Sequence, residues 1–189
     1  KNIIILNNSK IEKAEIKDRL LQIYGKNIFL VKREDLEKPL RKIKFLEKIQ
    51  VKKKYPNSLI IKIFETKPIA YIFKKNKKYI LDSSSNLILN EDIIITGNLP
   101  NIFGEKAENN FMKFLNNLKI NEFPYYNIEN YYYFKIDRWD VEFSDERTIK
   151  FPSTKIEDAI KKSVQLLNRS DFEKYKIIDL RVDGKIIVE

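Results

Sequence analysis

The sequence contains no histidine and no cysteine among its 189 residues. Without histidine, the chain has no imidazole to serve as a general base, as a metal ligand or as part of a Ser–His triad. Without cysteine, it has no thiol nucleophile, no thiolate ligand for zinc or an iron–sulfur cluster, and no disulfide. These absences remove the side chains of many enzyme active sites. Asp137, Asp140 and Glu142 lie close in sequence and could supply paired carboxylates for glycoside chemistry. However, Asp140 and Glu142 alternate with apolar residues, as in an ordinary half-buried strand. We expect no catalytic residues, no bound metal and no cofactor.

Glycine and long apolar runs are also scarce. The four glycines lie far apart, at Gly25, Gly97, Gly104 and Gly184, so the sequence has no glycine-rich loop that could cradle a phosphate. No apolar run approaches the roughly 18 residues of a membrane-spanning helix. The sequence begins at Lys1 rather than at methionine, and it is therefore compatible with a membrane anchor upstream.

The composition is strongly basic, with 37 Lys and Arg against 27 Asp and Glu and a formal net charge of +10. Such a charge is compatible with binding to nucleic acid or to an anionic lipid surface. However, lysine outnumbers arginine by about four to one, whereas recognition of bases and phosphates favours the arginine fork. The abundance of Ile, Lys and Asn is typical of an AT-rich genome, so we expect no nucleic-acid partner. A nucleic-acid binder stays the third hypothesis, which a gel shift at two salt concentrations would test.

Residues 1–66 are predicted to form a domain with the element order β-α-α-β-β. A β-branched run at Asn2–Leu6 predicts a strand. Ser9 and Glu12 have the spacing of a capping box, and the helical apolar pattern that follows ends at Gly25 in the C′ position. A second, shorter helix is predicted over Arg33–Lys42.

Two strands are predicted to complete this first domain. Phe45–Tyr55 and Ser58–Phe64 are joined by a turn sequence that contains proline and asparagine. Alternation of apolar and other residues indicates that each strand buries one face. Two helices on one face of a three-stranded sheet make a small α+β domain, and the pattern changes at Glu65–Pro68.

Residues 67–189 are predicted to form a mainly antiparallel β domain with flanking helices. One helix is predicted over Ala107–Ile120, and another begins at Thr154, which has Glu157 in the spacing of a capping box. The predicted strands are Ile69–Lys74, Lys77–Leu81, Asn86–Leu89, Ile93–Thr96, Tyr131–Arg138, Trp139–Ser144, Arg147–Phe151, Ile177–Val182 and Ile186–Val188.

Several short motifs follow one another in the order found in one bacterial family. Glu65-Thr66-Lys67-Pro68-Ile69-Ala70 matches a Glu-Arg-x-Pro-x-Ala motif, with threonine in place of arginine. Leu99–Gly104 with Ala107 matches Leu-Pro-x-apolar-x-Gly-x-x-Ala, and Asp179-Leu180-Arg181 matches an Asp-Leu-Arg-Tyr motif near the C-terminus. Together these matches resemble the FtsQ/DivIB family of bacterial cell-division proteins over nearly the whole chain.

The resemblance implies a POTRA domain followed by the β domain of that family. It implies a non-enzymatic scaffold of the divisome, acting in septum formation. The family is anchored in the bacterial inner membrane by a single span, with this region in the periplasm and enriched at the division site. The expected partners are FtsB and FtsL, and further FtsK and the septal synthases. The alternative that stays open is a POTRA-containing module of an outer-membrane protein assembly or transport factor.

The C-terminal strand is the strongest candidate for a binding site. A last strand with no chain after it is expected at a sheet edge, where unpaired backbone groups can accept a strand from a partner. The resemblance implies that FtsB binds here by strand addition. The matching positions are Arg181, Val182, Gly184, Ile186 and Ile187, together with Arg138, which lies close to the partner-binding face in the family.

For each candidate a purely structural interpretation is also open. Arg181 could form an ordinary cross-strand pair, and Ile186–Val188 could simply complete the core. The only tryptophan, Trp139, is more often a core residue than a binding hot spot. The lysine run Lys52–Lys54 could face anionic lipid or an acidic partner, although a solvated strand face is the more common arrangement. Val182 replaces the tyrosine of the family motif, so backbone pairing is expected to carry more of the affinity.

Overall fold

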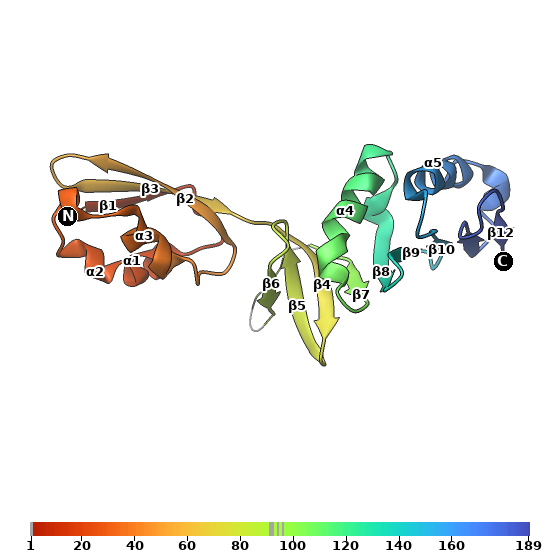
Figure 1. Cartoon of the computed structure of the whole chain (residues 1–189), viewed down its shortest axis with the longest axis horizontal. Helices are drawn as coiled ribbons and strands as arrows, with labels where there is room; N and C mark the ends of the chain where they lie inside the picture. Colours follow the sequence, from red (N-terminus) through yellow and green to blue (C-terminus); the bar gives the residue numbers. More distant parts are fainter. Residues whose placement is uncertain (1, 91–92, 94, 96) are drawn as a thin grey trace. The chain divides into compact units, whose positions relative to one another are not determined.

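Two separately packed units make up the chain (Figure 1). The structure, a computed structural model, describes residues 2–90, 93, 95 and 97–189. Contacts between residues divide it into an N-terminal unit, Lys1–Lys67, and a C-terminal unit, Pro68–Glu189. Each unit combines a β-sheet with helices, which confirms the predicted α+β fold class.

The N-terminal unit has the predicted order of strands and helices. Its sheet has the strand order β1-β3-β2, with β1 parallel and β2 antiparallel to the central strand β3. Both β1 and β2 are therefore edge strands. The elements are β1 (Asn2–Leu6), α1 (Lys13–Arg19), α2 (Leu21–Tyr24), the 3-10 turn η1 (Ile28–Leu30), α3 (Arg33–Leu40), β2 (Leu46–Lys54) and β3 (Ser58–Glu65).

One face of this sheet packs on the helices because the strand residues alternate. On β3, Leu59, Ile61 and Ile63 are at most 1% exposed, and they point to the same face because side chains alternate along a strand. The helices contribute Ile16 and Leu36, which are equally buried. The predicted burial of one face of β3 is confirmed.

The predicted first helix is divided into two. Leu20, with φ −104° and ψ 12°, separates α1 from α2. Gly25 follows α2 as its C-cap with φ −81°, which is right-handed helical geometry. The prediction of Gly25 in the C′ position, where a left-handed residue is usual, is therefore wrong.

A carboxylate from the end of β3 replaces the predicted capping box. Glu12 precedes α1 but makes no side-chain cap hydrogen bond. The backbone N–H groups of Ser9, Lys10 and Ile11 donate to the carboxylate of Glu65, at 2.7, 2.8 and 3.0 Å. The prediction of a capping box at Ser9 and Glu12 is therefore wrong, because the backbone N–H groups of this loop bind the side chain of Glu65, which is distant in the sequence.

This loop keeps Glu65 ionised. Partial burial acts to raise the pKa of Glu65, but the N–H groups of Ile11, Ser9 and Lys10 outweigh burial and hold the pKa below its ordinary value of 4.5. Because the pKa is lower in the folded than in the unfolded chain, the ionised carboxylate stabilises the fold above the unfolded pKa. This stabilisation is lost as the pH falls through the folded pKa.

The C-terminal unit is built on one extended sheet. In the described residues its strand order is β12-β11-β10-β9-β8-β7-β4-β5-β6. Most neighbouring strands are antiparallel, whereas β7 is parallel to both β4 and β8, and β10 is parallel to β11. The elements are β4 (Pro68–Lys74), β5 (Lys77–Asp82), β6 (Leu87–Leu89), β7 (Asn101–Phe103), α4 (Ala107–Ile120), η2 (Tyr125–Asn127), β8 (Ile128–Phe134), β9 (Arg138–Phe143), β10 (Thr148–Lys150), α5 (Ile156–Leu167), η3 (Ser170–Phe172), β11 (Ile177–Asp179) and β12 (Ile187–Val188).

Aromatic side chains dominate the core between α4 and the sheet. Trp139 on β9 is 3% exposed and stacks on Phe114 of α4, with ring centroids 5.0 Å apart. Tyr131 on β8 is 1% exposed and meets Phe111 edge to face at 5.0 Å. Burial raises the pKa of Tyr131, so its phenol stays neutral. Trp139 is therefore a core residue.

Two strand boundaries differ from the prediction. Arg138 opens β9 and pairs with Phe134 at the end of β8, so the predicted strand Tyr131–Arg138 is too long. The chain turns at Asp137, which has φ 57° and accepts a hydrogen bond from the Tyr133 hydroxyl at 2.7 Å. The predicted strand Ile93–Thr96 lies largely outside the described residues.

The start of α5 is also corrected. Lys155, in the left-handed region at φ 52°, precedes the helix and makes no side-chain cap hydrogen bond. The predicted cap by Thr154 with Glu157 is therefore wrong. The helix buries Ile160, Ser163 and Leu166.

Glu65→Ala should lower the free energy of unfolding at pH 7 by about 2 kcal/mol, because three N–H groups lose a charged acceptor. The difference from the wild type should shrink in acid, where Glu65 is protonated. Urea unfolding followed by circular dichroism at pH 7 and in acid measures both effects. Glu47→Ala, at an exposed position on β2, is the matched control and should cost less than about 0.5 kcal/mol. Equal losses from the two substitutions would contradict the capping role.

Gly104→Ala should destabilise the C-terminal unit by about 3 kcal/mol or more. Gly104 has φ +120°, and an added Cβ would lie 2.2 Å from the carbonyl oxygen of Tyr133. Gly97→Ala is the matched control, because Gly97 has φ +102° but an added Cβ would meet nothing within 4 Å. Thermal unfolding should therefore rank wild type, Gly97→Ala and Gly104→Ala in decreasing stability; the reverse order for the two variants would disprove the clash.

Candidate functional site

The last strand of the chain lies at the edge of the large sheet. β12 pairs with β11 and stands at the end of the strand order. Its register is antiparallel, with Val188 opposite Ile178 and Ile187 opposite Asp179. The strand is shorter than predicted, because Ile186 lies outside it. An edge strand carries backbone groups that its own sheet does not pair.

The register determines which backbone groups face the open side. Ile177 and Glu189 exchange two hydrogen bonds, each of 3.1 Å. In an antiparallel pair such hydrogen-bonded positions alternate with non-hydrogen-bonded ones. Ile178 and Val188 therefore form a non-hydrogen-bonded pair, and the N–H and C=O of Val188 point away from β11, toward the open edge. The N–H and C=O of Ile187 point toward β11.

Exposed aliphatic side chains accompany these backbone groups. Val182 is 47% exposed, Ile186 37% and Ile187 45%. They lie on β12 and on the turn before it, where Gly184 has φ +73° and Lys185 donates its N–H to the Val182 carbonyl at 3.1 Å. The interpretation that Ile186–Val188 simply complete the core does not fit these exposed fractions.

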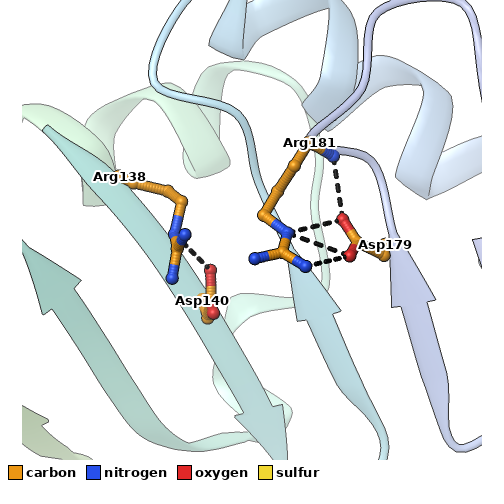
Figure 2. Close-up of polar contacts among 4 residues, drawn as sticks. All are labelled: Arg138, Asp140, Asp179 and Arg181. Atoms are coloured by element: carbon orange, nitrogen blue, oxygen red, sulfur yellow. Dashed lines mark hydrogen bonds and ion pairs between the residues drawn. The ribbon is translucent and has the colours of Figure 1, made fainter. Parts of the chain in front are cut away.

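Arg181 is held in place by Asp179, two residues earlier. The Arg181 Nε donates to both carboxylate oxygens at 2.9 Å, its Nη2 donates at 2.5 Å, and its backbone N–H donates at 3.0 Å (Figure 2). These side-chain hydrogen bonds from Arg181 lower the pKa of Asp179. The Asp179 side chain is 10% exposed and that of Arg181 40% exposed, so the carboxylate is sheltered while the guanidinium reaches solvent.

Arg138 forms a second pair of this kind on β9. Its Nε lies 3.4 Å from Oδ1 of Asp140 (Figure 2). Its guanidinium lies over the Phe134 ring, 3.8 Å from the centroid. Both the Arg138 Nε and the Asp140 Oδ1 are buried without a hydrogen-bond partner. Burial raises the pKa of Asp140, against the opposing charges of Arg138, Arg181 and Lys150.

The aspartates of the two pairs belong to one row of cross-strand neighbours. Lys150 on β10 pairs in register with Asp140 of β9 and with Asp179 of β11, which in turn pairs with Ile187 of β12. Residues in register project from the same face of a sheet. The charged row defined by Asp140, Lys150 and Asp179 therefore runs across three strands and ends at the exposed Ile187 on the edge.

The structure brings the predicted site residues to one region but changes their immediate partners. Arg181 binds an aspartate of its own strand segment rather than forming a cross-strand pair. The predicted strand Ile177–Val182 ends at Asp179, because the Arg181 N–H donates to the Asp179 carboxylate instead of to a neighbouring strand.

Sequence reasoning missed the roles of Asp140, Asp179 and Lys150. A signal for the two aspartates was present, since Arg138-Trp139-Asp140 and Asp179-Leu180-Arg181 each place opposite charges two residues apart. That spacing puts both side chains on one face of a strand. Lys150 carries no such local signal.

The described part of the chain contains neither a cluster of metal ligands nor a helix that could span a membrane. Among these residues, no group of three or more Asp or Glu is placed to hold a metal ion. Within the same residues, none of the helices combines the length and the apolar character that crossing a bilayer requires.

Comparisons with known proteins match both units. Residues 1–66 match the family model described as POTRA domain, FtsQ-type, and residues 70–181 match the model described as cell division protein FtsQ/DivIB, C-terminal. The second match ends at Arg181, so β12 lies beyond it. The cell division protein FtsQ of Rickettsia felis is 27% identical over 193 residues, covering 100% of this chain and 71% of the relative. That of Rickettsia prowazekii is 26% identical with the same coverage.

These matches confirm the resemblance that the sequence motifs indicated. They fit the observed succession of a small unit, with helices between its first strand and its last two strands, and a large, mainly antiparallel sheet. This family is one of structural cell-division proteins associated with the membrane at the division site, and it is not an enzyme family. The chain belongs to the FtsQ/DivIB family of bacterial cell-division proteins.

Proposed function

We propose that this chain is a divisome scaffold that captures FtsB, together with FtsL, by adding a partner strand to β12. The observation that carries the proposal is the open edge of β12, where the N–H and C=O of Val188 face away from β11. A partner segment that pairs there gains backbone hydrogen bonds, and alternate side chains supply specificity. No bond-making step is involved.

Apolar contact is the second contribution to the proposed binding. A partner strand on β12 would cover the half-exposed side chains of Val182, Ile186 and Ile187. Burying the whole of such a side chain contributes about 1.5–3 kcal/mol, and these side chains are already about half buried. Together they would add several kcal/mol to the gross interaction, before the ordering of the partner is subtracted.

Charge is the third contribution to the proposed binding. Arg181 uses its Nε and Nη2 to bind Asp179, which leaves its Nη1 available in an arginine with five N–H donors. A carboxylate of the partner would accept from these remaining donors in a charge-assisted hydrogen bond. Arg138 lies beside Asp140, at the end of the charged row away from β12, and its buried Nε has no hydrogen-bond partner.

The wider setting follows from the family. We propose a single-pass anchor in the bacterial inner membrane, with this region in the periplasm at the division site. FtsK and the septal synthases are further proposed partners, with FtsK binding to the POTRA region. The match of residues 70–181 to the FtsQ/DivIB C-terminal model leaves the outer-membrane assembly alternative without support.

Val188→Pro should reduce capture of an FtsB ectodomain at least tenfold, because proline removes the N–H that faces the open edge while the pairing of Ile187 with β11 stays. Ile187→Pro is a less selective change, since the N–H of Ile187 points toward β11. Val188→Thr keeps the N–H and is the matched control. Pull-down and calorimetry with the FtsB ectodomain measure binding, and circular dichroism checks the fold. If Val188→Pro captured the FtsB ectodomain as well as the wild type does, the strand-addition mechanism would be contradicted.

Arg181→Glu should weaken the same complex by about 2 kcal/mol or more, because it places a carboxylate where the partner is expected to present one. Arg169→Glu is the matched control: Arg169 also pairs with an aspartate two residues away, Asp171, but on η3. Binding measured for both variants at low and moderate salt should separate them. A similar loss for both would mean that net charge, rather than Arg181, governs the affinity.

A further inference from the structure

Three large apolar side chains are exposed at one end of the N-terminal sheet. Phe29 is 67% exposed, Leu30 72% and Tyr55 55%. The rings of Phe29 and Tyr55 stack with their centroids 4.8 Å apart. We define these three residues, with Lys53 and Lys54, as the tip. It is remote in sequence from the β12 edge and plays no part in the proposed strand addition.

The core of the unit does not require the apolar residues of the tip. On η1, Ile28 is 3% exposed, and the following Val31 is also 3% exposed, so these two residues fix the turn to the core. Asn27 caps the turn by accepting the Phe29 N–H at 3.0 Å on its side chain. Phe29 and Leu30 are therefore held outward on a rigid turn, and packing does not account for their apolar character.

The tip gathers three segments at the same end of the sheet. These segments are η1, the β2–β3 connection and the start of β1, where the Asn2 N–H donates to the Asn57 carbonyl at 2.9 Å. Lys53 ties the first two together, because its Nζ lies 3.4 Å from the Phe29 carbonyl oxygen. Glu65 and the Ser9–Ile11 loop that it binds lie at the opposite end of this sheet. The tip is therefore at the end of the unit away from that loop (Figure 1).

The charge around the tip is of one sign. Residues 20–32 and 48–58 contain no aspartate or glutamate. Lys26 is paired with Asp35 of α3 at 3.1 Å, whereas Lys53 and Lys54 form no ion pair with any described residue. The tip therefore combines exposed aromatic and aliphatic side chains with uncompensated lysines.

We propose that the tip inserts into the surface of a bilayer that contains anionic phospholipid. Aromatic rings favour the interface between headgroups and acyl chains, an aliphatic side chain reaches further in, and lysines bind the phosphate groups. A membrane fits better than an acidic protein. Phe29, Leu30 and Tyr55 project from two turns, whereas the hot spots of protein interfaces lie in packed pockets. The neighbouring cavity of about 650 Å³ beside β2 is lined by Lys53 of the tip, but by none of its three apolar side chains.

Sedimentation with lipid vesicles tests the proposal on the full chain. We expect binding to vesicles of 70% phosphatidylcholine and 30% phosphatidylglycerol, and little binding to pure phosphatidylcholine. Phe29→Ser with Leu30→Ser should lower the partition coefficient at least tenfold. Lys53→Gln with Lys54→Gln should lower it by about fivefold for each lysine. Circular dichroism checks that both double variants are folded.

Matched controls distinguish binding by the tip from nonspecific hydrophobic binding and from an effect of net charge. Lys42→Gln with Lys44→Gln makes the same charge change just before β2, at the other end of the sheet, and should bind like the wild type. Ile120→Ser with Ile136→Ser removes two exposed aliphatic side chains from the C-terminal unit, 78% and 64% exposed, and should also bind normally.

A direct reporter of insertion is the variant Phe29→Trp. Its emission should shift to shorter wavelength on anionic vesicles and be quenched by brominated lipid, while Trp139 is buried in the core and stays unaffected. Any one of three results would overturn the proposal. These are failure of the wild type to bind anionic vesicles, an equal loss of binding in the tip and control variants, and absence of quenching at position 29. The proposal would also be overturned if the chain bound polyglutamate through Lys53 and Lys54 but did not bind vesicles. That result would indicate that the partner is an acidic protein.

Discussion

The exchange of two backbone hydrogen bonds between Ile177 and Glu189 decides what the C-terminal edge can offer a partner. It fixes the antiparallel register of β12 on β11, and this register turns the N–H and C=O of Val188 outward. A slip of one residue would move every side chain of the strand to the other face. The proposed capture of a partner strand and the position of Ile187 at the end of the charged row both depend on this pairing.

The charged row explains how Arg138 and Arg181 can be held in place before any partner arrives. Asp179 binds Arg181 and Asp140 lies beside Arg138, so neither guanidinium is left without a counter-charge, which would be costly in a partly buried position. The aspartates also hold the arginines in one orientation. A binding surface that is ordered in advance loses less entropy when a partner docks, and Lys150 between the two aspartates reduces their mutual repulsion.

Elements with local signals could be predicted from the sequence, and features that depend on distant residues could not. The helix Ala107–Ile120 was predicted to the residue because its apolar spacing is contained within it. The cap that Glu65 supplies to Ser9 joins residues 56 apart, and no local pattern indicates it. At the candidate site, the edge position of the last strand follows from the chain order, but the row from Asp140 to Asp179 depends on strand pairing that the sequence does not display.

The two exposed surfaces differ in what they can bind. The edge offers backbone groups, half-exposed aliphatic side chains and arginines already oriented by aspartates, and these features suit a peptide whose own backbone completes the ladder. The three apolar side chains of the tip extend from turns rather than from a strand. Phe29 and Leu30 lie on a turn that Ile28 and Val31 have already fixed to the core. A surface of apolar side chains that project from turns and are flanked by lysines gains most from a partner that is fluid and anionic. A lipid headgroup layer has both properties, whereas a folded acidic protein has only one.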